Sequence, residues 1–447
     1  MLMKRKIVFL FLTLSGFVSC FSEELPDTAK QSTFLLTDDD VETKSNLVSY
    51  SVFFTEGRVL GFDKYVRSYL KEKETRSLMT EVSIDTYVGR GMNSKETQWT
   101  RSAKDYNYPT FSFGLRYNFN HGTMLHRDNK DWPGKEVDYN THLGDVITLY
   151  GRFLRPVFRT SRWTGGYYLG TGVGYSMSTY DTKEHIDNEL IGTHFNIFFT
   201  VGAYIDYRLS KDFRISAGLD FAHHSNGALY RPNKGANYLG PFVGLKYVPQ
   251  APQSTATSKS PLPQKEKEEW QKHPLFLEFS LGVGAKSLDE DWQLTQFRMK
   301  KGDPDYRTDK FSVYGAFSLQ TDVLYRYARR WASGLGFDVF YGDYSDKVAR
   351  VDQKLGCVEQ HYSPWSLGIA IKHEAFYGPL SARVGIGKYV YRHMGGFAKH
   401  QEASYYERIG LFYSFSKLQG MSIGFSVKAH KTKADFTELQ LAFPIHL

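Results

Sequence analysis

The chain has 447 residues, a formal net charge of +8 and a mean hydropathy of −0.43. Its 39 glycines and 16% aromatic content suit strands in which apolar and polar positions alternate. There are only two cysteines, Cys20 and Cys357, which excludes a disulfide framework in the mature chain. The basic residues are too scattered for a nucleic-acid-binding surface.

Residues 1–22 are predicted to be a secretory signal peptide, because three basic residues at 4–6 precede an apolar run over residues 7–19. Ordinary cleavage near Ser22 is one interpretation of its end, and lipidation of Cys20 is the other. No other stretch approaches the ~20 apolar residues that a membrane-spanning helix needs. The mature chain can therefore enter a membrane only as strands.

The rest of the chain divides by composition into four segments. Residues 23–76 are predicted to be an N-terminal segment on the periplasmic side, with a short helix within residues 61–76. Residues 77–248 are predicted to form a first β-barrel domain. Residues 249–273, rich in Pro, Ser and Thr and then in charges, have the composition of a linker. Residues 274–447 are predicted to form a second, degenerate barrel-like domain.

Both halves show period-two alternation over runs of about ten residues. In residues 193–207 the apolar face is Phe195, Ile197, Phe199, Val201, Ala203 and Ile205, against His194, Asn196, Thr200, Gly202 and Asp206. An exported β-sandwich alternates too, but the many Gly and Ser on the second face favour a narrow barrel interior. The sequence predicts an all-β outer-membrane protein of two tandem eight-stranded antiparallel barrels, with one larger barrel as the alternative.

One strand ends in residues that could perform chemistry. Over residues 213–225 the apolar, outward parity ends in His223 and Ser225, about 7 Å apart at Cα. A serine becomes a good nucleophile when an imidazole accepts its proton. Asn237, in the next strand, shares the outward parity of its own strand and can lie beside the pair. The intervening loop offers amide donors for an oxyanion at Asn226, Asn233 and Gly235.

The alternative interpretation is an ordinary polar loop at a strand end, with residues 232–235 as its turn. A metal site is not expected, because His223 and His224 point to opposite faces and no other residues stand at ligand spacing. We therefore expect neither a metal nor a cofactor.

The pattern H-x-S-N at residues 223–226, followed by P-N-x-G at residues 232–235, resembles the lipid A 3-O-deacylase family. Bacteroidetes-type members of that family are often called acyloxyacyl hydrolases. The resemblance implies an eight-stranded outer-membrane barrel whose lipid-facing site hydrolyses an ester-linked acyl chain of lipid A without a metal.

The resemblance also implies a role for each site residue. His223 would be the general base, Ser225 the nucleophile, and Asn226 or Asn233 the oxyanion donors. Asn237 stands where the family usually has Glu. An amide can orient the imidazole but cannot stabilise its positive charge as a carboxylate does.

The second half resembles the companion barrel of longer family members. Aligning Gly424 with Gly218 puts Ala429 and Lys431 at the positions of His223 and Ser225, so this half is expected to be inactive. By parity, His430 and Glu438 are expected to be interior structural residues.

The first hypothesis is a lipid A deacylase, a serine esterase of the outer membrane. The second is a non-catalytic outer-membrane barrel that keeps the fold and binds lipid, and the third is a small pore. The expected partners are lipid A, lipopolysaccharide and outer-membrane lipids. A homodimer is left open, and nucleic acid is not expected.

Overall fold

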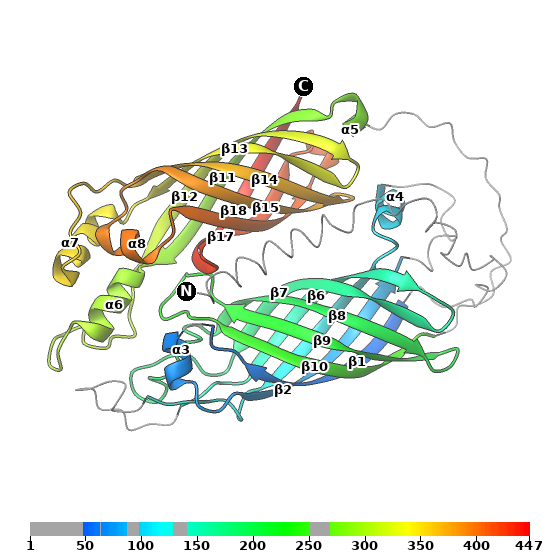
Figure 1. The fold of residues 1–447 in the computed structure, drawn as a ribbon, viewed down its shortest axis with the longest axis horizontal. Helices are drawn as coiled ribbons and strands as arrows, with labels where there is room; N and C mark the ends of the chain where they lie inside the picture. Colours follow the sequence, from blue (N-terminus) through cyan, green and yellow to red (C-terminus); the bar gives the residue numbers. More distant parts are fainter. Residues whose placement is uncertain (1–47, 63, 87–97, 128–140, 250–268) are drawn as a thin grey trace. The chain divides into compact units, whose positions relative to one another are not determined.

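The computed structural model of the protein describes residues 48–62, 64–86, 98–127, 141–249 and 269–447. These residues form two closed antiparallel barrels of eight strands each (Figure 1). The prediction of two tandem barrels is confirmed, and the single larger barrel is wrong. The predicted signal peptide, Cys20 and most of the predicted linker lie outside the described residues.

The first barrel closes when its first strand pairs with its last, in the order β1-β10-β9-β8-β7-β6-β3-β2. Its strands are β1 (Val48–Val59), β2 (Glu74–Asp85), β3 (Thr110–Phe119), β6 (Val146–Arg159), β7 (Trp163–Ser176), β8 (Phe195–Arg208), β9 (Phe213–Ser225) and β10 (Ala236–Tyr247). Two short strands, β4 (Met124–Leu125) and β5 (Thr141–His142), form a separate small sheet. The helices are α3 (Lys64–Tyr69) and α4 (Gln98–Asp105).

The second barrel closes in simple chain order, with β11 paired to β18. Its strands are β11 (Leu275–Ser287), β12 (Val313–Ala328), β13 (Trp331–Gly342), β14 (Trp365–Tyr377), β15 (Leu380–Arg392), β16 (Tyr405–Ser414), β17 (Ser422–His430) and β18 (Lys433–His446). Its helical segments are α5 (Glu269–Lys272), α6 (Asp289–Phe297), α7 (Ser345–Leu355), α8 (Gly396–Gln401) and the 3-10 turn η3 (Ser416–Leu418). Both barrels belong to one compact unit, Lys44–Leu447.

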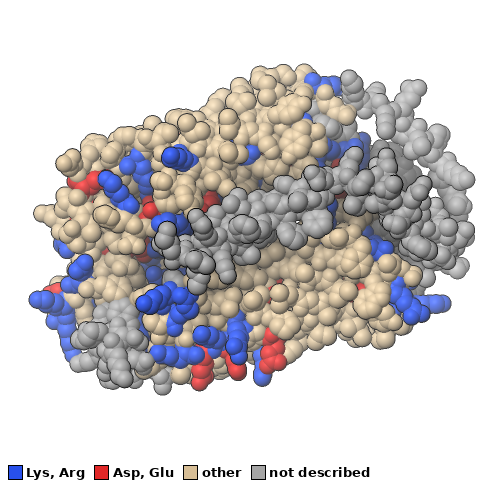
Figure 2. Space-filling model, in the orientation of Figure 1, with Lys and Arg blue, Asp and Glu red and all other residues tan. Residues whose placement is uncertain are grey.

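Alternation along the strands gives each barrel an apolar outside and a polar inside. Outward side chains such as Leu149, Phe195 and Ile371 are 68%, 69% and 68% exposed. Figure 2 shows charged side chains only in scattered groups on the visible face, with other residues covering most of the described surface. Inside the first barrel, Arg116 and Asp220 form a buried ion pair with a 2.6 Å contact. This distribution suits strands that face hydrocarbon.

The N-terminal segment differs from the prediction, because β1 begins at Val48 and the barrel does not start at residue 77. The sequence pattern did not reveal β1 because of Phe53. It is buried inside the barrel, where it packs edge-to-face against Phe242, so an apolar residue interrupts the polar parity of the strand. The local pattern Val52-Phe53-Phe54 consequently does not alternate.

The short helix α3 is present within the segment for which the sequence predicts a helix. It follows β1 at the end where the Leu60 N–H donates to the carbonyl oxygen of Asn237. The long loops over residues 177–194 and 226–235 connect strands at this end. At the other end, two of the three connections are short turns, over residues 160–162 and 209–212, and the third joins β2 to β3 over residues 86–109. Outer-membrane barrels have mostly short periplasmic turns and long extracellular loops, so these lengths favour an outer placement of α3 over the predicted periplasmic one.

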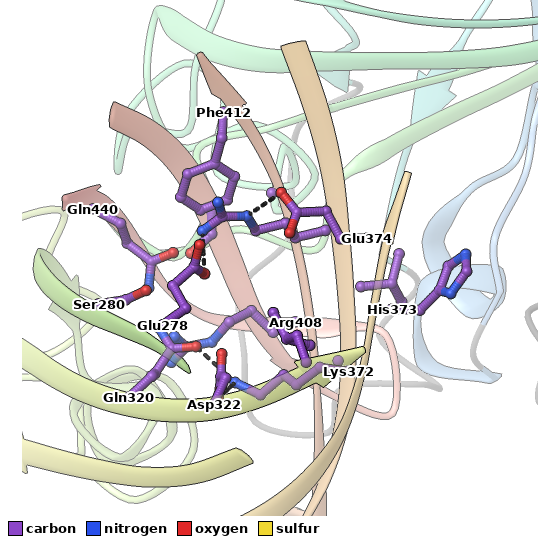
Figure 3. Close-up of a pocket in the computed structure, with 16 residues that line it drawn as sticks. Glu278, Ser280, Gln320, Asp322, Lys372, His373, Glu374, Arg408, Phe412 and Gln440 are labelled. Carbon is purple, nitrogen blue, oxygen red and sulfur yellow. Dashed lines mark hydrogen bonds and ion pairs between the residues drawn. The ribbon is translucent and has the colours of Figure 1, made fainter. Parts of the chain in front are cut away.

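The interior of the second barrel is filled by an ion-pair network around a small cavity (Figure 3). Arg383 bonds Glu374 at 2.9 Å and Glu278 at 2.7 Å, and Lys372 bonds Asp338 at 2.8 Å. The cavity measures about 30 Å³, room for roughly two water molecules. The paired side chains around this cavity are those expected of a narrow barrel whose interior is filled by side chains.

We therefore expect no ion conductance when the purified protein is inserted into a planar bilayer, with a general porin as the positive control. Buried ion pairs fill the interior of the second barrel, and paired charges such as Arg116 and Asp220 fill the interior of the first. Ions therefore have no open path through the described part of either barrel. Stepwise conductance that scales with the amount of protein would contradict the packed interior.

No helix within the described ranges is long and apolar enough to cross a membrane.

Candidate active site

The paired strands β9 and β10 bring the three predicted catalytic residues together. Asn237 lies directly opposite His223 in the antiparallel register. Ser225 is the last residue of β9, two positions beyond His223 and on the same face. Two neighbouring strands are therefore enough to assemble the three side chains.

Two hydrogen bonds join these side chains in series. His223 Nδ1 lies 2.7 Å from Asn237 Oδ1, and His223 Nε2 lies 2.9 Å from Ser225 Oγ. Asn237 Nδ2 donates to the carbonyl oxygen of Gly235 at 3.4 Å, which turns the amide oxygen toward the imidazole. Because an amide oxygen can only accept, Nδ1 carries the proton and Nε2 can accept the serine proton. This is the tautomer that a general base needs.

Apolar side chains surround the pair on the outward face. In the pairing of β8 with β9, Phe199 lies beside His223 and Ile197 lies beside Ser225. Both belong to the outward parity of β8, the face on which Phe195 is exposed. The serine and histidine are half-buried at the end of this apolar stripe, where an acyl chain could reach them.

Residues 226–235, called the Ser225 loop from here on, are folded back by side-chain hydrogen bonds. The Asn226 N–H donates to Asn233 Oδ1 at 3.0 Å, and Asn226 Nδ2 donates to the carbonyl oxygen of Tyr230 at 3.1 Å. The Gly235 N–H donates to the carbonyl oxygen of Leu190 at 3.0 Å. The backbone N–H groups of Asn226 and Gly235, two of the predicted donors, are therefore engaged within the protein. Since Asn233 uses its amide oxygen as acceptor, its Nδ2 remains the candidate donor.

Gly235 has a steric role that the sequence did not indicate. Its φ is +75°, and a Cβ at this position would lie 2.6 Å from His223 Cε1. Real Cβ atoms do not approach another atom so closely, so a side chain here would push the imidazole. The absence of a side chain at Gly235 thus keeps His223 in line between Asn237 and Ser225.

Replacing Gly235 by alanine is expected to lower turnover about 10²-fold, because a shift of the imidazole by about 1 Å misaligns it with Ser225. Gly356→Ala is the matched control: its φ is +73°, and a Cβ there would meet nothing within 4 Å. Both variants carry the cost of a left-handed conformation, but only the first collides with the imidazole of His223. Equal turnover in the two variants would contradict the steric role.

The segment that holds the far end of the Ser225 loop was not predicted from the sequence. The N–H of Lys234 donates to the carbonyl oxygen of Glu189 at 3.0 Å, next to the bond from Gly235 to Leu190. Glu189 is itself buried, and it accepts a hydrogen bond from Tyr65 at 2.7 Å and pairs with Arg127. The apolar pair at residues 190–191, within a loop between two strands, was the available signal.

His430 and Glu438 of the second barrel lie in its interior, as predicted. His430 Nε2 is 2.8 Å from the Tyr389 hydroxyl, and Glu438 accepts a hydrogen bond from Ser318 at 2.6 Å. Both residues are nearly fully buried.

One cluster in the second barrel, Glu402, His430 and Asp435, has the spacing to hold a metal ion. However, both oxygens of Asp435 are already engaged, one by Lys428 Nζ at 2.5 Å and the other by Lys286. The carboxylate of Glu402 is likewise engaged, by an ion pair with Arg392. These cations compete with a metal for the carboxylates, so the cluster is an ion-pair network.

Comparison with known proteins follows the division into two barrels. Residues 86–246 match the family model described as lipid A 3-O-deacylase (PagL), and residues 275–447 match the model described as acyloxyacyl hydrolase, C-terminal domain. No curated protein matches the chain.

Two solved structures are similar in part. The crystal structure of the outer membrane enzyme PagL shares 15% identity over 43% of this chain and 97% of its own, with a TM-score of 0.25. The N-terminal β-barrel domain of Pseudomonas aeruginosa OprF shares 14% identity over 45% of this chain and 98% of its own, with a TM-score of 0.22.

Proposed function

The chain belongs to the lipid A 3-O-deacylase family, and we propose that it acts as a serine esterase that hydrolyses an ester-linked acyl chain of lipid A. It is an outer-membrane β-barrel protein, so the outward faces of its strands meet lipid. The observation that carries the proposal is the hydrogen-bonded series of Asn237, His223 and Ser225 on such a face.

In the proposed reaction, Ser225 Oγ attacks the carbonyl carbon of the ester while its proton passes to His223 Nε2. The tetrahedral intermediate collapses, and the sugar oxygen leaves with the proton from His223. Water then attacks the acyl-serine, with His223 again as the base, and a fatty acid is released. The net reaction is hydrolysis, in which the ester and water give an alcohol and a fatty acid.

Asn237 orients the imidazole during these steps. Its amide oxygen holds the Nδ1 proton at 2.7 Å and thereby keeps Nε2 directed at Ser225. It supplies no full negative charge to the imidazolium that forms, so we expect slower turnover than a carboxylate at this position would allow.

We assign Asn233 Nδ2 as a donor to the oxyanion. The Asn226 N–H fixes the orientation of this carboxamide by bonding its oxygen. A donor fixed before the reaction stabilises the developing negative charge without a cost of reorganisation.

The substrate approaches from the membrane. The site lies at the end of the barrel with the long loops, which in such proteins faces the outside of the cell, where the outer leaflet carries lipopolysaccharide. Ile197 and Phe199 lie beside the dyad and provide an apolar surface for the acyl chain.

Mass spectrometry of lipid A extracted from cells that express the chain tests the proposal, in a strain without its own deacylase. Wild-type protein is expected to lower the mass of lipid A by one ester-linked acyl chain, whereas Ser225→Ala leaves lipid A intact. An unchanged lipid A profile with folded wild-type protein in the outer membrane would contradict the proposal and favour a barrel that binds lipid without turnover.

A further inference from the structure

The first residues of the Ser225 loop, which follow directly after Ser225, form hydrogen bonds with residues of the second barrel. The carbonyl oxygen of Gly227 accepts a hydrogen bond from Thr437 Oγ1 of β18 at 3.0 Å. The carbonyl oxygen of Ala228 accepts one from the N–H of Ser287, the last residue of β11, at 2.9 Å. Two consecutive peptide groups of the loop are thus fixed by the second barrel.

The middle of the loop is held in the same way. Arg231 is 4% exposed, and its Nε donates to the carbonyl oxygen of Ser287 at 3.2 Å. Its Nη1 lies 3.5 Å from Asp289 Oδ1 in α6. The Tyr230 hydroxyl donates to the carbonyl oxygen of Asp309 at 2.7 Å.

Asp289 is charged where it meets Arg231. Burial would raise the pKa of Asp289, but the cations Lys433 and Arg231 hold that pKa well below its usual range. A buried guanidinium is costly unless a negative group balances it, so the loop and α6 depend on each other at this contact.

The first peptide groups of the loop have a backbone conformation that must be stabilised by contacts with other parts of the protein. Gly227 and Ala228 have φ values of +62° and +71°, and the second is unfavourable for a residue with a Cβ. Such a conformation persists when surrounding contacts fix it. At Gly227 the contact is so close that an added Cβ would overlap Thr437 Oγ1.

We infer that the second barrel positions the Ser225 loop for catalysis, with Thr437 and Asp289 as positioning residues. They act through the backbone after Ser225 and through Asn233, which the loop carries, and so determine where the oxyanion donor stands. This inference rests on the proposed function. It gives the second barrel a role in the reaction although it has Ala429 and Lys431 in place of a dyad.

The role of a positioning element differs from that of a substrate-binding element in its kinetics. A displaced oxyanion donor weakens an interaction that forms in the transition state, so it lowers kcat and leaves KM nearly unchanged. A lost substrate contact raises KM. The two roles can therefore be separated with steady-state kinetics on the same substrate.

The experiment uses the full-length protein and lipid A in mixed micelles, with KM expressed as the mole fraction of lipid A. Thr437→Val and Asp289→Ala are made singly and together. Thr321→Val is the matched control, because Thr321 lies on the outward face of β12, away from the contacts described above. Heat-modifiable migration on gels checks that each variant is folded.

We expect the double variant to lose about tenfold or more in kcat with KM within about twofold of the wild type, and the control to be unchanged. A rise in KM at unchanged kcat would overturn the inference in favour of substrate binding by the second barrel. Wild-type kinetics in the double variant would also overturn it. If the wild type itself releases no fatty acid, the proposed function fails instead, which is a distinguishable outcome.

Discussion

Replacing Ser225 by alanine is expected to lower the rate of lipid A deacylation on the order of 10⁴-fold or more, with the barrel intact. Ser225 Oγ is the hydroxyl that His223 Nε2 contacts at 2.9 Å, and its loss removes the nucleophile while leaving the strand pairing unchanged. The measurement is the initial rate of fatty acid release from lipid A by purified protein.

Ser333→Ala is the matched control for this prediction. Ser333 Oγ also bonds a histidine, His373 Nδ1, at 2.9 Å, but the pair lies in the second barrel. In Figure 3, His373 points away from the ion-pair cluster of the interior. Its loss is expected to leave the rate unchanged. A large loss in Ser333→Ala and none in Ser225→Ala would move the active site to the second barrel.

Replacing Asn237 by leucine is expected to lower turnover about 10³-fold. Leucine has a similar size but no acceptor for the Nδ1 proton of His223, so the imidazole loses both its orientation and its preference for the tautomer with Nε2 open to the serine. The accompanying loss of the bond from Asn237 Nδ2 to Gly235 is at the loop end and costs less. The readout is kcat for lipid A, compared at equal amounts of folded protein.

The partner variant, Asn237→Asp, separates orientation from charge. It keeps an acceptor at the same position and adds a negative charge that stabilises the imidazolium in the transition state. We expect turnover at least equal to that of the wild type. If the leucine variant kept full turnover, Asn237 would have no part in catalysis and the family's acid position would be unused here.

The outward placement of the site could be predicted from the sequence because strands have a period of two. His223 and Ser225 share a parity with Leu219 and Phe221, and the structure places them on the same face. The position of Asn237 followed from the antiparallel pairing of consecutive strands, which fixes the register across a loop. These features depend only on residues close in sequence.

Other features could not be predicted, because they depend on contacts between residues far apart in the chain. Phe53 is an interior residue only because Phe242 and Arg152 surround it, so the local pattern concealed β1. Which backbone N–H groups of the Ser225 loop are engaged depends on Leu190 and Asn233. The bond from Thr437 to Gly227 joins residues 210 positions apart. No periodicity carries such information.

The side-chain amide of Asn237 forms hydrogen bonds on both sides. It has the geometry of an orienting residue, with one oxygen toward His223 and one nitrogen toward Gly235. A barrel that merely retained the fold would have no need of this hydrogen-bonded series on a lipid-facing strand, where polar side chains are costly. The geometry thus favours turnover over lipid binding alone.

The most direct test is to incubate purified protein with lipid A in water labelled with heavy oxygen, and to weigh both products by mass spectrometry. The wild type is predicted to release one ester-linked fatty acid per lipid A, carrying one labelled oxygen in its carboxyl group, and Ser225→Ala to release none. Intact lipid A with the folded wild type, or equal release by Ser225→Ala, would contradict the assignment of Ser225 as the nucleophile of a lipid A esterase.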